Sequence, residues 1–322
     1  MNSESHTILI TGVAGFIGSN LADYLLKLGT ISGRQVSVIG LDNLAYGIRE
    51  QVPVGVDFRQ ADIRDKNLHE HFTGVDTVFH FAAKNCISDC QLDPVETADI
   101  NITGTANVFA AAVRQKVSKV IYAESSALYE GSSVLPTPET EVAPQSMYAI
   151  SKLAGMHFAE AFMRFHGLKS TALRYFCVYG PRQDYRRTIP PVMSAFILKL
   201  LKGESPVIYG NGTKRRDFIH VDDINRFHVQ CITDSRTDGA VFNLGSGTNH
   251  SVLDIYEEVG RLLKTSQPIT YKPDMPGEAQ DTLGDIALAQ SLGWQPEFDL
   301  TRGLQTMIDY LQAEIAAGRI SL

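Results

Sequence analysis

Residues 7–18 read T-I-L-I-T-G-V-A-G-F-I-G, and a helix-like run, S-N-L-A-D-Y-L-L-K-L-G, follows directly. This order predicts a strand, a glycine turn and a helix. Gly12, Gly15 and Gly18 would let the backbone turn tightly, approach a pyrophosphate and pack the helix against the strand. The first N–H groups of the helix would face the phosphates. The stretch predicts a dinucleotide site; the alternative is a glycine-rich turn without a ligand. Its spacing is G-x-x-G-x-x-G rather than the G-x-G-x-x-G of ordinary dehydrogenases.

A second β-rich run, residues 36–41, ends immediately before Asp42. In dinucleotide-binding folds a carboxylate at this place accepts hydrogen bonds from the adenosine ribose. The same charge would repel a 2′-phosphate, so we expect NAD rather than NADP. The alternative is that Asp42 only caps a turn.

Strand-like and helix-like runs alternate as far as residue 176. We expect strands at 56–59, 76–81, 117–126 and 170–176, and helices at 94–115 and 146–165. This alternation predicts an α/β fold, a Rossmann-type doubly wound parallel sheet. Side chains at the carboxyl ends of its strands are expected to face the ligand. Asp62, which we expect to reach the adenine, and Ala82, Ala83, Ser125 and Ser126 stand at such ends.

The composition shifts towards proline, glycine and basic residues after about residue 177. We therefore expect an NAD-binding domain at residues 1–176 and a smaller α/β domain for the substrate at residues 177–322. Runs near 217–224 and 240–247 are expected to return to the large domain. Further helices are expected at 192–202, 251–263 and 299–316.

The overall charge argues against several classes of partner. With a net charge of −7, the chain has no basic footprint for nucleic acid or an anionic membrane surface. Its four cysteines do not form a disulfide scaffold or complete a metal site. No signal peptide and no apolar run of membrane-spanning length is apparent. We expect a cytoplasmic protein that binds no metal, nucleic acid or membrane.

Tyr148 and Lys152 stand four residues apart in Q-S-M-Y-A-I-S-K-L-A-G, so they would project from one face of the predicted helix. A free tyrosine has a pKa of about 10, and a neighbouring ammonium favours the phenolate. Lowering that pKa by about three units requires roughly 4 kcal/mol. The spacing alone also fits a surface Tyr and Lys on an ordinary amphipathic helix.

Together, these motifs resemble the extended short-chain dehydrogenase/reductase family, and within it the nucleotide-sugar 4-epimerases. The resemblance covers nearly the whole chain. It rests on T-G-V-A-G-F-I-G, L-D-N at 41–43, A-D-I-R-D, H-F-A-A, N-I-T-G-T, the Ser125 strand end, Y-A-I-S-K, R-Y-F-C-V-Y-G-P-R-Q, R-R-D-F-I-H-V-D-D, N-L-G-S-G, P-G-E and S-L-G-W-Q-P.

The resemblance implies a mechanism. Tyr148 would be the base that takes the proton of the sugar 4-hydroxyl, and Ser125 would hydrogen-bond the same hydroxyl. Lys152 would hold the nicotinamide ribose and lower the tyrosine pKa. The C4 hydride would pass to NAD, and the transient 4-keto sugar would turn over and take the hydride back on its other face. Family members commonly form homodimers, here through the helices at 101–115 and 146–165.

The resemblance also implies two sets of binding residues. Expected cofactor contacts are Gly12, Gly15, Phe16, Ile17, Gly18, Asp42, Asn43, Asp62, Ile63, Ala82, Ala83, Lys84, Asn101, Tyr148, Lys152 and Tyr175. Expected contacts to a UDP-sugar are Ser125, Ser126, Cys177, Val192, Tyr209, Arg216 and Thr282. Arg216 would grip the diphosphate in a bidentate manner; the alternative is a surface ion pair with Asp217 or Asp223.

The chain departs from the epimerase pattern at several positions. Cys177 replaces an asparagine and is more simply a buried core thiol. Glu124 replaces a small residue beside Ser125, where its carboxylate either faces solvent, the reading we favour, or tunes the substrate. Glu130 replaces a glycine. Met275 and Pro276 stand where an arginine usually precedes P-G-E, so Lys272, Arg215 or Arg182 would have to supply that contact.

Thr282 aligns with a gatekeeper that is a bulky tyrosine in epimerases restricted to glucose and galactose. A smaller side chain leaves room for a 2-acetamido group, so we expect UDP-N-acetylglucosamine and UDP-N-acetylgalactosamine as substrates.

Three alternative functions stay open. A 4,6-dehydratase would need an Asp-Glu pair where this chain has Ser126 and Ala127. A uronate epimerase or decarboxylase would use Arg186 or Arg187, and a dinucleotide sensor would lack catalysis.

Overall fold

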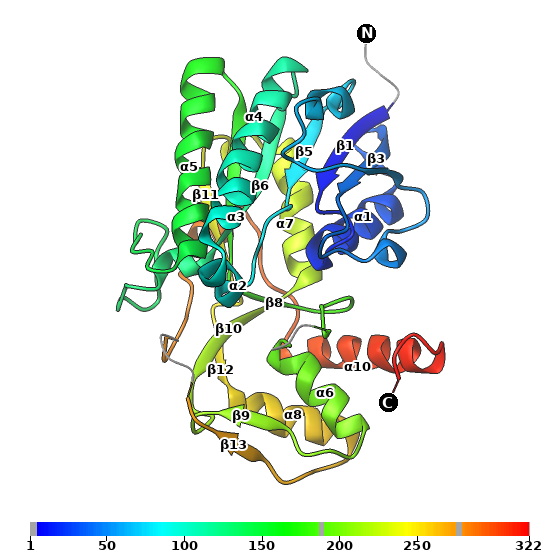
Figure 1. Ribbon diagram of the computed structural model, residues 1–322, viewed down its shortest axis with the longest axis vertical. Coiled ribbons are helices and arrows are strands. Elements are labelled where there is room, and N and C mark those ends of the chain that lie inside the picture. Colours follow the sequence, from blue (N-terminus) through cyan, green and yellow to red (C-terminus); the bar gives the residue numbers. More distant parts are fainter. Residues whose placement is uncertain (1–4, 187–189, 275–278, 322) are drawn as a thin grey trace.

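The computed structural model describes residues 5–186, 190–274 and 279–321. A mostly parallel sheet of eight strands forms the centre of the larger part (Figure 1). Its order is β11-β7-β6-β5-β1-β3-β2, with β4 pairing in parallel with β3. The strands are β1 (Ser5–Thr11), β2 (Thr30–Ile31), β3 (Arg34–Asp42), β4 (Asp57–Gln60), β5 (Thr77–His80), β6 (Lys119–Ser125), β7 (Lys169–Tyr175) and β11 (Val241–Leu244). The predicted doubly wound sheet is confirmed.

The strand order determines where a ligand can bind. The chain builds outward from β1 to β3 and β4, then returns to β5 and builds in the opposite direction. Helices that follow β1 and β5 therefore leave the sheet on opposite sides, and their strands' carboxyl ends border a crevice. The glycine turn after β1 lies at this point.

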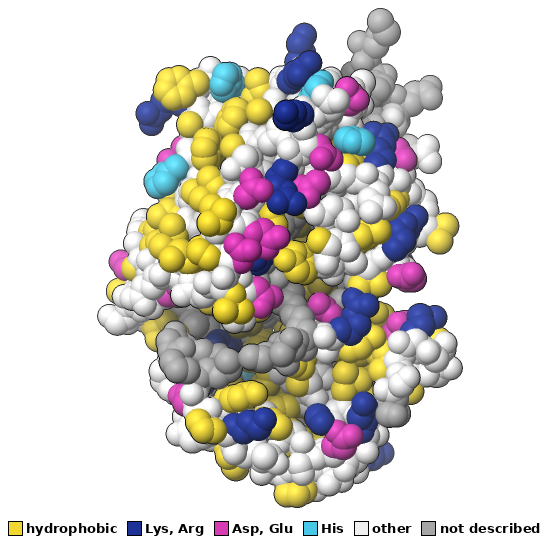
Figure 2. Space-filling view, viewed as in Figure 1, with side chains coloured by type: hydrophobic (Ala, Val, Ile, Leu, Met, Phe, Trp, Pro, Cys, Tyr) yellow, Lys and Arg dark blue, Asp and Glu magenta, His cyan; other side chains and the backbone are white. Residues whose placement is uncertain are grey.

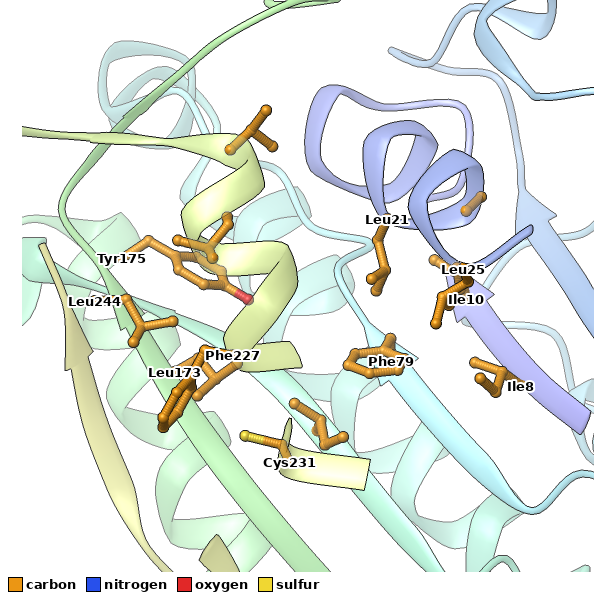
Figure 3. Packing of buried hydrophobic residues seen from close by; sticks show 14 of the residues in the cluster. Ile8, Ile10, Leu21, Leu25, Phe79, Leu173, Tyr175, Phe227, Cys231 and Leu244 are labelled. Carbon is orange, nitrogen blue, oxygen red and sulfur yellow. The ribbon is translucent and has the colours of Figure 1, made fainter. Parts of the chain in front are cut away.

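Helices cover both faces of the sheet, which explains the continuous apolar run in β1. Ile8 and Ile10 belong to the cluster on one face, and Leu9 belongs to the cluster on the other. Figure 3 shows Leu21 of α1 and Phe227 of α7 in the first cluster, together with Ile8, Ile10 and Phe79. The helices of this part are α1 (Phe16–Leu28), α2 (Ile87–Leu92), α3 (Pro94–Ala98), α4 (Thr105–Arg114), α5 (Met147–His166), α7 (Val221–Thr233) and α9 (Ala287–Ser291). Short 3-10 turns are η1 (Arg49–Gln51), η2 (Leu68–Phe72), η4 (Ser126–Tyr129) and η5 (Ser235–Thr237).

The single helix expected over residues 94–115 is interrupted. A π-helical segment, η3 (Asp99–Gly104), lies between α3 and α4. It turns Asn101 into the interior, where the residue is 2% exposed, and sets Gly104 against Ile63. The spacing of apolar residues is helical on both sides of such a segment, so the sequence pattern did not reveal the interruption. π-Segments inside α-helices are frequent at functional sites.

The smaller part lies below the large sheet in Figure 1. One sheet joins β12, β10 and β8, and a second pairs β13 with β9. Apolar side chains of α6, α8 and α10 pack together against these strands. The elements are α6 (Val192–Leu201), α8 (Val252–Leu263), α10 (Leu300–Ala316), β8 (Cys177–Tyr179), β9 (Val207–Tyr209), β10 (Arg215–His220), β12 (Asn249–Ser251) and β13 (Thr270–Lys272).

The chain crosses between the two parts more than once. β11 pairs with β7 in the large sheet, whereas β10 belongs to the smaller part and leads into α7. The buried carboxylate of Asp217 in β10 accepts hydrogen bonds from the backbone N–H groups of Ser246, Gly247 and Gly284. These bonds tie β10 to the segment after β11. We keep the division at residue 176 as a proposal.

None of the helices in the described residues is long and apolar enough to cross a membrane.

Candidate active site

The glycine turn lies tightly against the end of β5. Gly12 has a φ of 74°, and a Cβ there would lie 2.8 Å from the backbone nitrogen of Ala82. A Cβ on Gly18 would overlap the carbonyl oxygen of Gly12. Gly15 caps the N-terminus of α1, and Phe16 and Ile17 form its first turn. The turn thus leaves room for a close backbone approach, as a bound pyrophosphate requires.

Asp42 is the last residue of β3 and lies beside this turn. Its carboxylate accepts the backbone N–H of Ala14 at 3.0 Å and that of Leu44 at 2.8 Å. Burial raises the pKa of Asp42, and these two N–H groups oppose the rise. Each carboxylate oxygen retains a lone pair for another donor, such as a ribose hydroxyl. The glycine turn and Asp42 together fit a dinucleotide.

Asp62 lies next to Asp42 across the sheet edge. Asn43 donates to its carboxylate at 2.9 Å, and the Arg64 guanidinium donates to both of its oxygens. These hydrogen bonds hold the pKa of Asp62 well below its usual range. The neighbouring carbonyl of Ile63 accepts from Asn107 at 2.7 Å. Asn43, Asp62 and Ile63 therefore form one ordered edge, and their contact with the cofactor stays a prediction.

Asn101 connects the end of β5 to α5. Its side-chain oxygen accepts the N–H of Lys84 at 2.8 Å, and its amide donates to the Lys84 carbonyl and to Ser151 Oγ at 2.9 Å each. The Ser151 hydroxyl in turn donates to the Tyr148 carbonyl at 2.7 Å. Ala82 and Ala83 begin the same connection after β5. Asn101 thus orients the helix that carries Tyr148.

Tyr148 and Lys152 lie in the first two turns of α5, and Ser125 ends β6. The Lys152 ammonium donates to the Ala123 carbonyl at 3.1 Å and lies 6.0 Å from the centre of the Tyr148 ring. Ser125 Oγ accepts the N–H of Ala127 at 3.1 Å, so its hydroxyl hydrogen is available to donate. Burial lowers the pKa of Lys152 to about 8, and Glu124 and then Cys90 oppose this. The structure therefore brings the three predicted catalytic residues to one strand end.

Glu130 anchors the start of α5, a role that the sequence pattern did not reveal. Its carboxylate accepts the N–H of Ser146 at 2.7 Å and the Ser146 hydroxyl at 2.8 Å. The Ser146 side chain then caps the helix by accepting from Ala149. The departure from glycine at position 130 and the Ser146 cap were the available signals. The Glu130 and Ser146 side chains fix the start of α5, and Tyr148 lies in the first turn after it.

The expectation that Glu124 faces solvent is wrong. Glu124 is 2% exposed, and its carboxylate accepts from Arg174 Nε at 2.7 Å and from the Tyr122 hydroxyl at 3.0 Å. Glu124 and Arg174 are direct partners in the β6–β7 ladder, so their side chains lie on the same face. Arg174 also donates to the Tyr129 hydroxyl. A buried ion pair therefore adjoins the predicted catalytic strand end.

Arg216 and Thr282 lie side by side at the edge of β10. The N–H of Thr282 donates to the Arg215 carbonyl at 3.1 Å, and its hydroxyl accepts the Asp217 N–H at 3.3 Å. Arg216 Nη1 donates to the carbonyls of Arg215 and Gln280. The Asp217 carboxylate accepts from the backbone N–H groups of Ser246 and Gly247. The contact of Arg216 and Thr282 with substrate stays a prediction.

The remaining substrate candidates are spread over the smaller part. Cys177 begins β8 and is half-buried rather than fully buried, and Val192 begins α6. Tyr209 ends β9 below the Lys272 ammonium, which lies 5.9 Å from its ring. Ser126 begins η4 directly after Ser125.

Two of the three proposed substitutes for the missing arginine have other partners. Arg182 donates to the Ser19 carbonyl and lies 3.7 Å from Asp23, and Arg215 bonds Asn249. Lys272 lies beside the Tyr209 ring, and its contact with substrate stays a prediction. Arg187, Met275 and Pro276 lie outside the described residues.

The side chain of Tyr175 is buried at the end of β7. Its hydroxyl is 2.7 Å from His228 Nε2, and Figure 3 shows it directed towards α7. Burial raises the pKa of Tyr175 well above its usual value. Only its backbone, at the end of β7, adjoins the strand end of Ser125.

Comparisons with known proteins agree with this geometry. A family model described as "NAD dependent epimerase/dehydratase family" matches residues 8–245. A Methanocaldococcus jannaschii protein, provisionally named a UDP-glucose 4-epimerase, is 34% identical over 95% of this chain and 98% of its own. The solved Thermotoga maritima UDP-glucose 4-epimerase with UDP-glucose has a TM-score of 0.90 and 32% identity, over 96% of this chain and 99% of that one. A Methanobrevibacter ruminantium UDP-N-acetylglucosamine 4-epimerase with UDP-N-acetylmuramic acid has a TM-score of 0.90 and 29% identity, over 97% and 100%.

The glycine turn gives a direct test of cofactor binding. We expect Gly12→Ala to weaken NAD binding at least tenfold, because its Cβ would displace the Ala82 backbone. Gly29→Ala is the matched control, since Gly29 has a φ of 73° and no atom within 4 Å of its Cβ position. Backbone strain should lower the free energy of unfolding of both variants by about 1–3 kcal/mol. Calorimetric NAD titration and thermal unfolding measure the two effects; equal NAD affinity in both variants would contradict the placement.

Proposed function

We propose that this chain, which belongs to the NAD dependent epimerase/dehydratase family, inverts C4 of UDP-N-acetylhexosamines. Its cofactor is NAD. The observation that carries the proposal is the convergence of Ser125, Tyr148 and Lys152 at the end of β6, on the edge of the sheet that also carries the glycine turn. A base, a hydroxyl donor and an ammonium at one strand end suit removal of a proton from a sugar hydroxyl.

Each of the three residues has a distinct role in this proposal. Tyr148 takes the proton of the 4-hydroxyl and later returns it to the inverted oxygen. Ser125 donates a hydrogen bond to that oxygen, since its hydroxyl hydrogen is not used when Oγ accepts the Ala127 N–H. Lys152 places a positive charge beside the Tyr148 ring and favours the phenolate. NAD, when bound, accepts the C4 hydride and returns it.

Thr282 supports acetamido sugars as the substrates. Its side chain is small, and its hydroxyl is held by the Asp217 N–H beside Arg216, the proposed diphosphate ligand. A tyrosine at this place would add a ring to the same edge of β10. The solved relatives include one with UDP-glucose and one named for UDP-N-acetylglucosamine, so the family's range spans both sugars.

The alternative chemistries have weaker support. A 4,6-dehydratase needs an acid and a base beside the strand end. Glu124 and Glu130 are the nearby carboxylates in sequence, and they are engaged by Arg174 and by the start of α5. A uronate enzyme would need a cation for the C6 carboxylate, and Arg186 lies 3.5 Å from Asp184. A non-catalytic sensor would not need an ammonium held beside the Tyr148 ring.

Product analysis with Tyr148→Phe tests the reaction type. NMR of wild-type protein with a panel of UDP-sugars should show interconversion at C4 alone. Tyr148→Phe should lose about 10²–10⁴-fold in kcat, because the proton acceptor is gone, and should still bind NAD. Loss of water or carbon dioxide from a sugar would select one of the alternative chemistries, and unchanged turnover in the variant would refute the base.

A substitution at the gatekeeper tests the sugar. Thr282→Tyr should lower kcat/KM for UDP-N-acetylglucosamine at least tenfold and affect UDP-glucose less, because the ring occupies the acetamido space. Thr73→Tyr on an exposed turn is the control and should change neither value. Equal acetamido-sugar turnover in wild type and Thr282→Tyr would show that residue 282 does not determine which sugar is accepted.

We also propose a homodimer through the helices at 101–115 and 146–165, for which α5 offers the clearest surface. Met147, Ile150, Phe158 and Phe165 recur at helical spacing on α5 and are 37–74% exposed. Figure 2 shows apolar side chains gathered on the side of the molecule where α5 lies in Figure 1. Such a stripe suits a self-complementary interface.

Light scattering tests the dimer. Wild-type protein should have twice the mass of the chain at micromolar concentration, and Phe158→Asp should be monomeric because it places a charge in the interface. Leu288→Asp, at a residue 44% exposed on α9, should stay dimeric. A monomeric wild-type protein would refute the interface.

A further inference from the structure

The buried carboxylate of Glu124 lies next to the group that positions Tyr148. Lys152 donates to the carbonyl of the peptide bond that joins Ala123 to Glu124. The Glu124 side chain projects on the same face of β6 as Tyr122, because the two are separated by one residue. Tyr122 belongs to the apolar cluster that also contains Ala159 of α5. Glu124 therefore lies between the sheet and the helix that carries Lys152.

Arg174 keeps this carboxylate ionised and fixed. The guanidinium donates from Nε to Glu124 at 2.7 Å, and both side chains are at most 1% exposed. Arg174 is itself held by the Tyr129 hydroxyl at 3.0 Å and the Glu139 carbonyl at 2.6 Å. Burial raises the pKa of Glu124, and the guanidinium, which does not deprotonate, opposes this. The negative charge therefore has a fixed position.

The other ionisable groups that face Lys152 do not carry this charge. His80 of β5 is held neutral by Thr11 and Thr105, which contact its two ring nitrogens at 2.8 and 3.0 Å. Burial, and to a smaller extent the Lys152 charge, lower the pKa of His80 to about 3. Burial raises the pKa of the Cys90 thiol of α2, so it is protonated at neutral pH. Tyr148 on α5 is the reacting group itself. Glu124 is the fixed anion among these neighbours.

We propose that Glu124 is an electrostatic positioning residue, whose carboxylate, fixed by Arg174, keeps the Lys152 ammonium charged beside Tyr148. An ammonium in an apolar place tends to lose its proton, and a nearby fixed anion opposes that loss. The effect on catalysis rests on the proposed function, whereas the effect on Lys152 does not. Glu124 need not touch the substrate.

Direct titration of Lys152 tests the proposal without reference to activity. Protein labelled with [ε-13C]lysine is titrated by NMR, and the Lys152 signal is identified from its loss in Lys152→Arg. The wild-type midpoint is expected near pH 8. In Glu124→Gln it should fall by about one pH unit, because the negative charge that raises the Lys152 pKa is lost. The alkaline limb of kcat/KM should move to lower pH by the same amount.

A second buried ion pair on the same strand provides the matched control. Lys119, at the opposite end of β6, lies 2.7 Å from Asp238, and its side chain is 7% exposed. Asp238→Asn also removes the carboxylate partner of a buried cation, so it should lower the melting temperature. It should leave the Lys152 midpoint unchanged. A shift of equal size in Asp238→Asn would show a general loss of structure and overturn the proposal.

The remaining outcomes are also decisive. An unchanged Lys152 midpoint in folded Glu124→Gln overturns the proposal, even if the enzyme is active. If the unpaired Arg174 prevents Glu124→Gln from folding, Glu124→Gln/Arg174→Gln removes the pair as a neutral unit. Loss of the Arg174 cation offsets part of the loss of the Glu124 anion, so the midpoint should still fall, but by less than in Glu124→Gln. A protein that shows this shift but interconverts no UDP-sugar refutes the proposed function alone.

Discussion

The hydrogen bond from the Lys152 ammonium to the Ala123 carbonyl joins helix α5 to strand β6, and the site depends on it. A cation in this low-dielectric place is costly unless hydrogen bonds and an opposite charge compensate it. The Ala123 carbonyl supplies the hydrogen bond, and Glu124 supplies the opposite charge. The fixed ammonium holds α5 against β6. Tyr148, one helical turn before Lys152, is therefore held at the strand end that carries Ser125.

Three further connections reduce the freedom of α5. Glu130 holds its N-terminus through Ser146, and Asn101 ties Ser151 to the chain after β5. The side chain of Arg174 links β7 to β6 beneath the helix. Because the proposed base and ammonium come from α5 and the proposed donor comes from β6, small shifts between helix and strand would cost much of the rate. The polar side chains around the site therefore act mainly as supports for a few reacting groups.

The fold was predictable from the sequence because its signals are local. The β1 run, its glycine turn and the alternation of strands and helices predicted a Rossmann-type sheet, which is confirmed along with the family resemblance. Gly12 and Gly18 were also recognisable, since their spacing reflects backbone contacts within one turn. Asp42 followed from its place at the end of a β-rich run.

What the sequence did not reveal depends on partners far along the chain. Glu124 was expected to face solvent, because nothing near position 124 indicates that Arg174, fifty residues away, lies opposite it. The π-segment at Asn101 leaves the apolar pattern almost unchanged. Thr282 and Arg216 come together only through the pairing of the 280–282 segment with β10. Such long-range pairs are set by topology and cannot be read from local periodicity.

We propose that C4 is inverted by removal and return of the same hydrogen. The most direct measurement follows deuterium placed at C4 of UDP-N-acetylglucosamine, by NMR and mass spectrometry of the sugars at equilibrium in ordinary water. Deuterium is expected to stay at C4 in both the gluco and the galacto epimers. Loss of the label to water, or its appearance at another carbon of the sugar, would contradict removal and return of the same hydrogen.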